Sequence, residues 1–260
     1  MKRVVLALAI AASAAASIGF ALIRSKDARH SSRNETTAGV PRFILWAWER
    51  PTNLRFIDPS RVGVAFLAKT IRIAADRVES KPRLQALDLP PNAKLIAVTR
   101  IETDRNAPPQ LSNEQRDAVV AAIAQLSALP NVREIQIDFD ATKSQRGFYR
   151  ELIVQLRRRL PSDVRLSITA LASWCMDDDW ISDLPIDEAV PMLFRMAGDG
   201  RSIINRLNSG DDFNSPACRG SYGISTDESR PQLISARKLY VFSADVWTED
   251  SVHKLLETNK

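Results

Sequence analysis

The chain has 260 residues, of which 45% are hydrophobic, and its formal net charge is +5. Residues 1–33 hold six of the 36 Lys and Arg residues and one of the 31 Asp and Glu residues, so the rest of the chain carries 30 of each. This neutral body argues against nucleic acid as a partner, because phosphate binding needs an excess of cations. The length beyond the N-terminal segment suits one large domain.

The N-terminal segment predicts export from the cytoplasm. Met1–Arg3 supplies a positive start, and Val4–Ile23 runs for twenty residues without a charge. Small residues at Ala12–Ala16 suit signal cleavage, whereas the continuing apolar run is long enough for an uncleaved membrane anchor. Both alternatives make the protein periplasmic or extracellular, either secreted or anchored to the inner membrane. The predicted division is a signal peptide or membrane anchor over 1–23, a flexible tether over 24–40 and a folded domain over 41–260.

From Arg42 onward the chain repeats a short apolar run, a turn, and a helical or looped stretch. Eight apolar runs predict strands: Phe43–Trp48, Val62–Ala68, Leu95–Ile101, Glu134–Asp140, Arg165–Ala170, Ala189–Arg195, Ser221–Ser225 and Leu239–Ser243. Four patterns predict helices: Asp117–Leu129 behind a capping box at Ser112–Gln115, Gln145–Leu160, Ser202–Leu207 ended by Gly210, and Glu249–Glu257 capped by Thr248. The links after the first, second, fifth and seventh strands are less regular.

Strands that alternate with helices imply right-handed parallel crossovers, and eight such units match a single-domain (β/α)8 TIM-type barrel. The alternative is a doubly wound open sheet. That fold usually has a Gly-rich phosphate turn after its first strand, where this chain has Glu49–Thr52 without a glycine.

Only two cysteines and two histidines occur in the chain. Cys175 lies just after the fifth predicted strand and Cys218 in the loop before the seventh, in adjacent sectors of the predicted barrel. In an oxidising compartment we therefore expect one disulfide between them; two buried reduced cysteines are the alternative. His30 lies in the tether and His253 in the last predicted helix, which excludes zinc sites built from several histidines. We expect no cofactor.

The segment Glu134–Asp140 alternates polar and apolar residues. Gln136, Asp138 and Asp140 share one face of this predicted strand, and the apolar residues share the other. Two carboxylates at the end of a strand repel each other, so a fold keeps them mainly to bind a cation, a sugar or a proton in transit. This pair therefore predicts a functional site at the barrel mouth.

Other polar and aromatic residues gather at the predicted strand ends. The residues predicted to bind substrate are Trp46, Trp48, Glu49, Lys69, Arg100, Trp174, Arg195, Asp245 and Trp247. Tryptophan faces stack on the C–H faces of sugar rings; the alternative is that these tryptophans plug the barrel. Arg100 and Arg195 would orient carboxylates or bind acidic sugar substituents, with a structural ion pair as the alternative.

The predicted catalytic carboxylates are Asp138, Asp140, Glu102 and Glu228. A glycosidase needs two carboxyl groups about 5–5.5 Å or about 6.5–9.5 Å apart. Asp140 would be the acid/base residue and Asp138 would tune its pKa. Glu102, Glu228 or Glu49 would be the second carboxylate.

Four blocks of the sequence together resemble a known family. They are Phe43–Pro51, Ile135–Ala141, Leu166–Cys175 and Val190–Met196. From about Arg42 to Trp247, the chain resembles the domain-of-unknown-function 3142 family, an uncharacterised bacterial family. The resemblance implies a single barrel-like domain and no catalytic residues.

A weaker resemblance is to chitinase-like glycoside hydrolases, whose fourth strand carries Asp-x-Asp-x-Glu. Asp138 and Asp140 match the two aspartates, but Thr142 stands at the position of the catalytic acid. If the chain hydrolyses glycosides, its acid must therefore come from elsewhere.

Three functions are compatible with these patterns. The first is a glycoside hydrolase-like barrel that acts on a cell-envelope or environmental glycan. The second is a saccharide-binding or envelope-assembly module without turnover. The third is divalent-cation chemistry at Asp138 and Asp140 with Glu102, through oxygen ligands.

Overall fold

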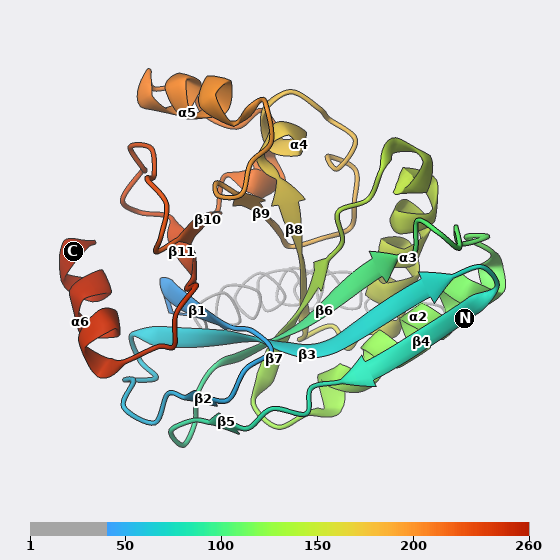
Figure 1. Ribbon diagram of the computed structural model, residues 1–260, viewed down its shortest axis with the longest axis horizontal. Coiled ribbons are helices and arrows are strands. Elements are labelled where there is room, and N and C mark those ends of the chain that lie inside the picture. The colour runs from blue at the N-terminus through green and yellow to red at the C-terminus, as the bar shows by residue number, and fades with distance from the viewer. Residues whose placement is uncertain (1–40, 260) are drawn as a thin grey trace, which may run out of the picture. The chain divides into compact units, whose positions relative to one another are not determined.

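The computed structural model describes residues 41–259 (Figure 1). The predicted signal peptide or anchor over 1–23 and the tether over 24–40 lie outside these residues. No helix within the described part of the chain is long and apolar enough to cross a membrane. The strands are β1 (Phe43–Ala47), β2 (Thr52–Asn53), β3 (Val62–Ala74), β4 (Arg77–Pro82), β5 (Leu87–Asp88), β6 (Leu95–Thr103), β7 (Val132–Asp138), β8 (Arg165–Leu171), β9 (Glu188–Met192), β10 (Ser221–Ser225) and β11 (Lys238–Phe242). The helices are α2 (Asn113–Ala124), α3 (Arg146–Arg159), α4 (Ala172–Met176), α5 (Gly200–Asn208) and α6 (Glu249–Thr258), with 3-10 turns η1 (Gln125–Ala128), η2 (Lys143–Gln145) and η3 (Pro216–Cys218).

Eight parallel strands close into a barrel. Their order is β1, β3, β6, β7, β8, β9, β10 and β11, and β11 pairs again with β1. The pairing of β1 with both β3 and β11 leaves no free barrel edge, which excludes the open-sheet alternative. All eight predicted strands are present, and the predicted TIM-type barrel is confirmed.

The predicted helices are also present, with small differences at their ends. Ser112 caps α2 through a capping box with Gln115, and Thr248 caps α6 in the same way. The apolar side of α3 is buried, including Phe148, Leu152 and Leu156. Between β1 and β3, between β3 and β6, and between β10 and β11, the described chain forms loops or short strands instead of α-helices.

The bottom of the barrel interior is filled by buried ionic groups. Arg165 Nε donates to Glu134 Oε2 at 3.2 Å, and Lys238 Nζ donates to Glu188 Oε2 at 2.7 Å. The Tyr240 hydroxyl lies 3.3 Å from an oxygen of each glutamate. Burial, and then the charge of Glu188, raise the pKa of Glu134, while Lys238 and Arg165 oppose this. These groups fill the interior near the amino ends of the strands, whereas active sites of parallel barrels lie at the carboxyl ends.

The strand β3 is longer than the barrel requires. It has 13 residues, and its second half pairs with the antiparallel strand β4 on one side and with β6 on the other. These three strands lie side by side and reach beyond the barrel mouth (Figure 1). We call this sheet, formed by residues 69–82 and 99–103, the β3–β4–β6 extension.

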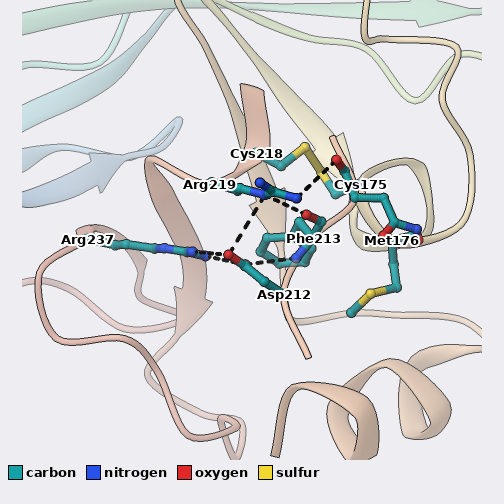
Figure 2. Close-up of a disulfide and its surroundings, with 8 residues drawn as sticks. Cys175, Met176, Asp212, Phe213, Cys218, Arg219 and Arg237 are labelled. Carbon is teal, nitrogen blue, oxygen red and sulfur yellow. Dashed lines mark hydrogen bonds and ion pairs between the residues drawn. A yellow bond between two sulfur atoms is a disulfide. The ribbon is translucent and has the colours of Figure 1, made fainter. Parts of the chain in front are cut away.

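The predicted disulfide is confirmed. Cys175 in α4 and Cys218 in η3 are bonded, with their Cα atoms 5.8 Å apart (Figure 2). Asp212, in the loop that this bond holds, accepts from Arg237 Nη1 at 2.8 Å and from Nη2 at 2.5 Å, and lies 3.8 Å from Arg219 Nε (Figure 2). A disulfide of this kind indicates an oxidising compartment.

Candidate functional site

A cavity of about 600 Å³ opens at the carboxyl ends of the barrel strands. This volume lies in the range of small-molecule sites. Its charged or hydroxyl-bearing lining residues are Glu49, Thr70, Lys81, Arg100, Glu102, Asp138, Asp140, Thr169 and Arg195. Its aromatic and aliphatic lining residues are Trp46, Trp48, Leu67, Val98, Leu171, Met192, Phe194 and Phe242. Eight of the predicted site residues are therefore in one place: Trp46, Trp48, Glu49, Arg100, Glu102, Asp138, Asp140 and Arg195.

Asp138 ends β7 with its side chain pointing into the barrel, as the period-two pattern predicts. Arg100 Nη1 donates to Asp138 Oδ2 at 2.8 Å, and the Thr169 hydroxyl donates to Oδ1 at 2.8 Å. Arg100 is the register partner of Asp138 on β6, which explains how the two groups meet. Both carboxylate oxygens are thus fixed and compensated by neighbouring strands.

Arg100 links two carboxylates and an aromatic ring. Its Nε donates to Glu102 Oε1 at 3.0 Å, and its guanidinium lies 5.9 Å from the ring centre of Trp48. The structural ion pair that was the alternative interpretation of Arg100 is therefore present.

Asp140 lies two residues beyond the end of β7 and lines the same cavity. Within residues 41–259, no cationic side chain lies within 4.0 Å of its carboxylate, and no hydrogen bond fixes it. Partial burial and the negative charge of Asp138 raise the pKa of Asp140, and Arg100 opposes them. A carboxyl group in this situation keeps its proton to a higher pH than an ordinary aspartate.

Four aromatic side chains form the floor and one wall of the cavity. The Trp46 indole N–H donates across the barrel to Gln136 Oε1 at 3.1 Å, and only 4% of this residue is exposed. Trp48 packs edge-on against Phe242, with ring centres 6.4 Å apart, and Phe242 stacks on Phe194 at 5.6 Å. Trp46 is therefore part of the barrel core that also forms the cavity floor, whereas Trp48, which is only half-buried, stands in the wall.

Two predicted tryptophans lie away from the cavity. Trp174 is buried and packs edge-on against Trp180, with ring centres 4.9 Å apart. Trp247 is buried, and its indole N–H donates to the Trp46 carbonyl oxygen at 3.0 Å. For these two residues the structure matches the alternative interpretation, in which tryptophans fill the core.

Lys69 also lies away from the cavity, for a local reason. The register between β3 and β6 shifts between Leu67 and Lys69, so Ala68 forms a bulge. A bulge reverses the alternation of side chains along a strand. Lys69 therefore points outward, and its Nζ donates to the Ala122 carbonyl oxygen of α2 at 3.0 Å. Thr70 takes the inward position instead.

Glu228 and Asp245 are outside the cavity lining as well. Glu228 Oε1 accepts from Arg195 Nη1 at 3.0 Å, and Asp227 Oδ2 accepts from Arg195 Nη2 at 2.8 Å. Arg195 is thus held by two carboxylates, which is again the structural ion pair. Asp245 is an exposed residue of the loop after β11.

Five further residues that line the cavity were not among the predicted site residues: Thr70, Lys81, Thr169, Phe194 and Phe242. Thr169 alternates with Ser167 along β8, so the same period-two pattern that marks Asp138 could have found it. Lys81 comes from β4, whose residues are mostly exposed and polar and carry no strand pattern.

Within residues 41–259, no group of three or more His, Cys, Asp and Glu side chains is arranged to hold a metal ion. Asp138 and Glu102 instead share the cation Arg100.

The fold and the site together define an eight-stranded parallel barrel with carboxylates and aromatic side chains at its mouth. Comparison with known families agrees with the resemblance found in the sequence: residues 92–193 match the family described as "Domain of unknown function (DUF3142)". A search of curated proteins gives no match.

Solved structures similar to this chain include two chitinases. The chitinase domain of the spore coat protein CotE from Clostridium difficile is 15% identical, with a TM-score of 0.38 over 62% of this chain and 53% of that one. A chitinase from Rhizomucor miehei is 8% identical, with a TM-score of 0.44 over 71% of this chain and 68% of that one. The chain thus spans about half the length of the first structure. The barrel is defined by the strand order of this protein itself, in which β1 pairs with both β3 and β11.

Proposed function

We propose that the cavity binds a saccharide and that the protein is a glycoside hydrolase-like barrel in which Asp140 donates a proton to the glycosidic oxygen. One observation carries this proposal: a carboxyl group with a raised pKa shares a cavity with the aromatic side chains of Trp48 and Phe242. A general acid must keep its proton near the working pH, and aromatic faces pack against the apolar faces of sugar rings.

Asp138 has a separate role in this proposal. Arg100 and Thr169 hold it in place at 2.8 Å each, and its negative charge helps to raise the pKa of Asp140. Asp138 is therefore a positioning and tuning residue, and Asp140 is the group that meets the substrate.

Hydrolysis also needs a second carboxyl group to activate water or attack the sugar. Glu102 lines the cavity but is paired with Arg100, and Glu228 is paired with Arg195. Glu49 lines the cavity from the end of β1, and in the described part of the chain no cationic side chain lies within 4.0 Å of it. We assign the second role to Glu49.

A second candidate function is saccharide binding without turnover. It is favoured by Thr142, which stands where the chitinase-like pattern has its acid. Its backbone N–H donates to Gln145 Oε1 at 2.8 Å, and Thr142 is not part of the cavity lining. The same cavity would then hold a glycan for recognition or envelope assembly.

The two functions are separated by measuring both binding and the release of reducing sugars with a panel of neutral and amino-sugar oligosaccharides. Hydrolysis predicts that wild type releases reducing ends. It also predicts that Asp140→Asn lowers the rate at least about 100-fold with affinity retained, as expected for loss of a general acid. Binding by wild type with no release of reducing ends would support the second candidate. No binding of any oligosaccharide would contradict both.

Two features support a place of action outside the cytoplasm. The disulfide suits an oxidising compartment, and the uncharged run Val4–Ile23 suits an export signal or an anchor. We therefore propose that the protein acts in the periplasm or outside the cell, secreted or held at the inner membrane. Fractionation of cells that produce the full chain, with detection of a C-terminal tag, tests this placement.

A further inference from the structure

We infer that the cavity continues into an open track along the inner face of the β3–β4–β6 extension, and that the ligand is a saccharide chain with several units lying on this track. The inference rests on the proposed saccharide binding and adds that the ligand is a polymer rather than a single sugar or a chain end.

The bulge at Ala68 creates the inner face of the extension. Leu67 points into the barrel before the bulge, and Thr70 does so after it. From Thr70 onward, alternate residues of β3 continue the inner surface of the barrel past its mouth. The outer face is apolar: Ile71 and Ile73 are fully buried and belong to the hydrophobic core.

Register partners complete the inner face. Thr70 is paired with Lys81 on β4 and with Arg100 on β6, and all three line the cavity. The next row outward consists of Glu79, Arg72 and Glu102. Because the pairing is continuous between these rows, the polar surface that begins inside the cavity extends without a break along the sheet.

A second hollow lies on this face. It has a volume of about 330 Å³, and its lining residues include Arg72, Ala74, Arg77, Glu79 and Asp104. Strands advance about 3.3 Å per residue, so Thr70 at the cavity and Ala74 in the hollow lie about 13 Å apart along β3. Cavity and hollow are therefore consecutive depressions of one surface, and together they are longer than one sugar ring.

The charges along the track favour a polyhydroxyl chain over a polyanion. Arg72 Nη2 lies 2.5 Å from Asp104 Oδ2, and Lys81 Nζ lies 3.9 Å from Glu79 Oε2. The face thus offers hydrogen-bond donors and acceptors in alternation, and it has no net excess of cations. Nucleic acid would require such an excess. Sugar hydroxyl groups both donate and accept hydrogen bonds, and they match such a surface.

The test compares the affinities of wild type and the double variant Arg72→Ala/Glu79→Ala, whose two residues line the second hollow and not the cavity, for oligosaccharides from the disaccharide to the hexasaccharide. The probes are the chitin-, chitosan- and cellulose-derived series. We expect affinity of wild type to rise with chain length. We also expect the double variant to lose about tenfold for the hexasaccharide, a change well within calorimetric resolution, while its disaccharide affinity stays unchanged.

Two single variants serve as controls: Ser80→Ala, on the opposite face of β4, and Lys254→Ala, an exposed lysine of α6. Both should bind every length as wild type does. Disaccharide binding with no gain from longer chains would overturn the track and leave the proposed function standing. Equal losses for short and long probes in the double variant would also overturn the track. Failure of all lengths to bind would overturn the proposed function with it.

Discussion

Arg100 Nη1 lies 2.8 Å from Asp138 Oδ2, and this ion pair organises the mouth of the barrel. The Asp138 side chain is only 10% exposed, so its carboxylate depends on this cation for compensation. The same guanidinium holds Glu102 at 3.0 Å and lies over the ring of Trp48. The Arg100 side chain thus fixes the carboxylates of Asp138 and Glu102 and packs over the ring of Trp48.

We expect Arg100→Met to lower the free energy of unfolding by about 2 kcal/mol. The loss is below the 3–5 kcal/mol of a fully buried pair because Arg100 is partly exposed. Denaturant unfolding measures this loss. The double variant Arg100→Met/Asp138→Asn should regain part of the lost stability, since it removes the uncompensated charge together with its partner. A double variant that loses the sum of the two single losses would show that the pair is not coupled.

Alanine variants of Trp46 and Trp48 should have different effects: the first mainly on stability, the second mainly on oligosaccharide binding. Trp46 is 4% exposed and packs against Tyr240 and Phe194, so Trp46→Ala should cost about 3–5 kcal/mol of unfolding free energy. Trp48 is half-buried in the cavity wall, so Trp48→Ala should weaken oligosaccharide binding about tenfold with a smaller loss of stability. Thermal unfolding and calorimetric titration of both variants measure the two effects. An unstable Trp48→Ala protein with normal affinity would move Trp48 into the core.

The disulfide between Cys175 and Cys218 closes a chain segment with a sequence separation of 43. Loop-closure entropy predicts that its loss costs about 4 kcal/mol. Cys175→Ser/Cys218→Ser should therefore unfold at lower denaturant concentration than wild type. Thiol titration of unfolded, unreduced wild type should find no free thiol. Finding two would contradict the bond itself.

Much of the barrel follows from local patterns. The eight apolar runs each form a strand because a closed parallel barrel buries both faces of every strand. The capping residues Ser112 and Thr248 mark helix starts correctly because their side chains satisfy the first free N–H groups. The strand β4 could not be predicted, because it is an exposed polar strand that depends on pairing with β3.

The candidate site could be predicted where the alternation of residues along a strand is regular. Asp138 points inward because Gln136 and Asp138 keep the period of β7. Lys69 shows where this reasoning fails: a bulge at Ala68 reverses the alternation, and a bulge depends on the neighbouring strand rather than on local sequence. The role of Trp247 was equally inaccessible, because its indole N–H bonds to Trp46, 201 residues away in the sequence. Trp174 packs against Trp180 in the irregular segment after α4, and no periodic pattern marks that contact.

Asp140 should control the pH dependence of the protein. Its pKa in the folded state is raised above 3.8, so the folded state binds its proton more tightly than the unfolded state does. Wild type should therefore gain stability relative to Asp140→Asn as the pH falls from neutrality through the raised pKa towards 3.8. Unfolding free energies of both proteins between pH 3.5 and about 7 measure this difference. A difference that does not change with pH would mean that Asp140 has an ordinary pKa.

The two neighbours of Asp140 should move its pKa in opposite directions. Asp138 raises it and Arg100 lowers it. Asp138→Asn should therefore shift the alkaline limb of the pH–rate profile to lower pH, because Asp140 then loses its proton more easily. Arg100→Met should shift the limb to higher pH. If the protein binds without turnover, titration of the Asp140 carboxyl carbon by NMR gives the same two shifts. If Asp138 and Arg100 had a merely structural role, both variants would lose stability, and the pH–rate limb would shift in the same direction in both or not at all. Shifts in opposite directions would identify Asp140 as the titrating group.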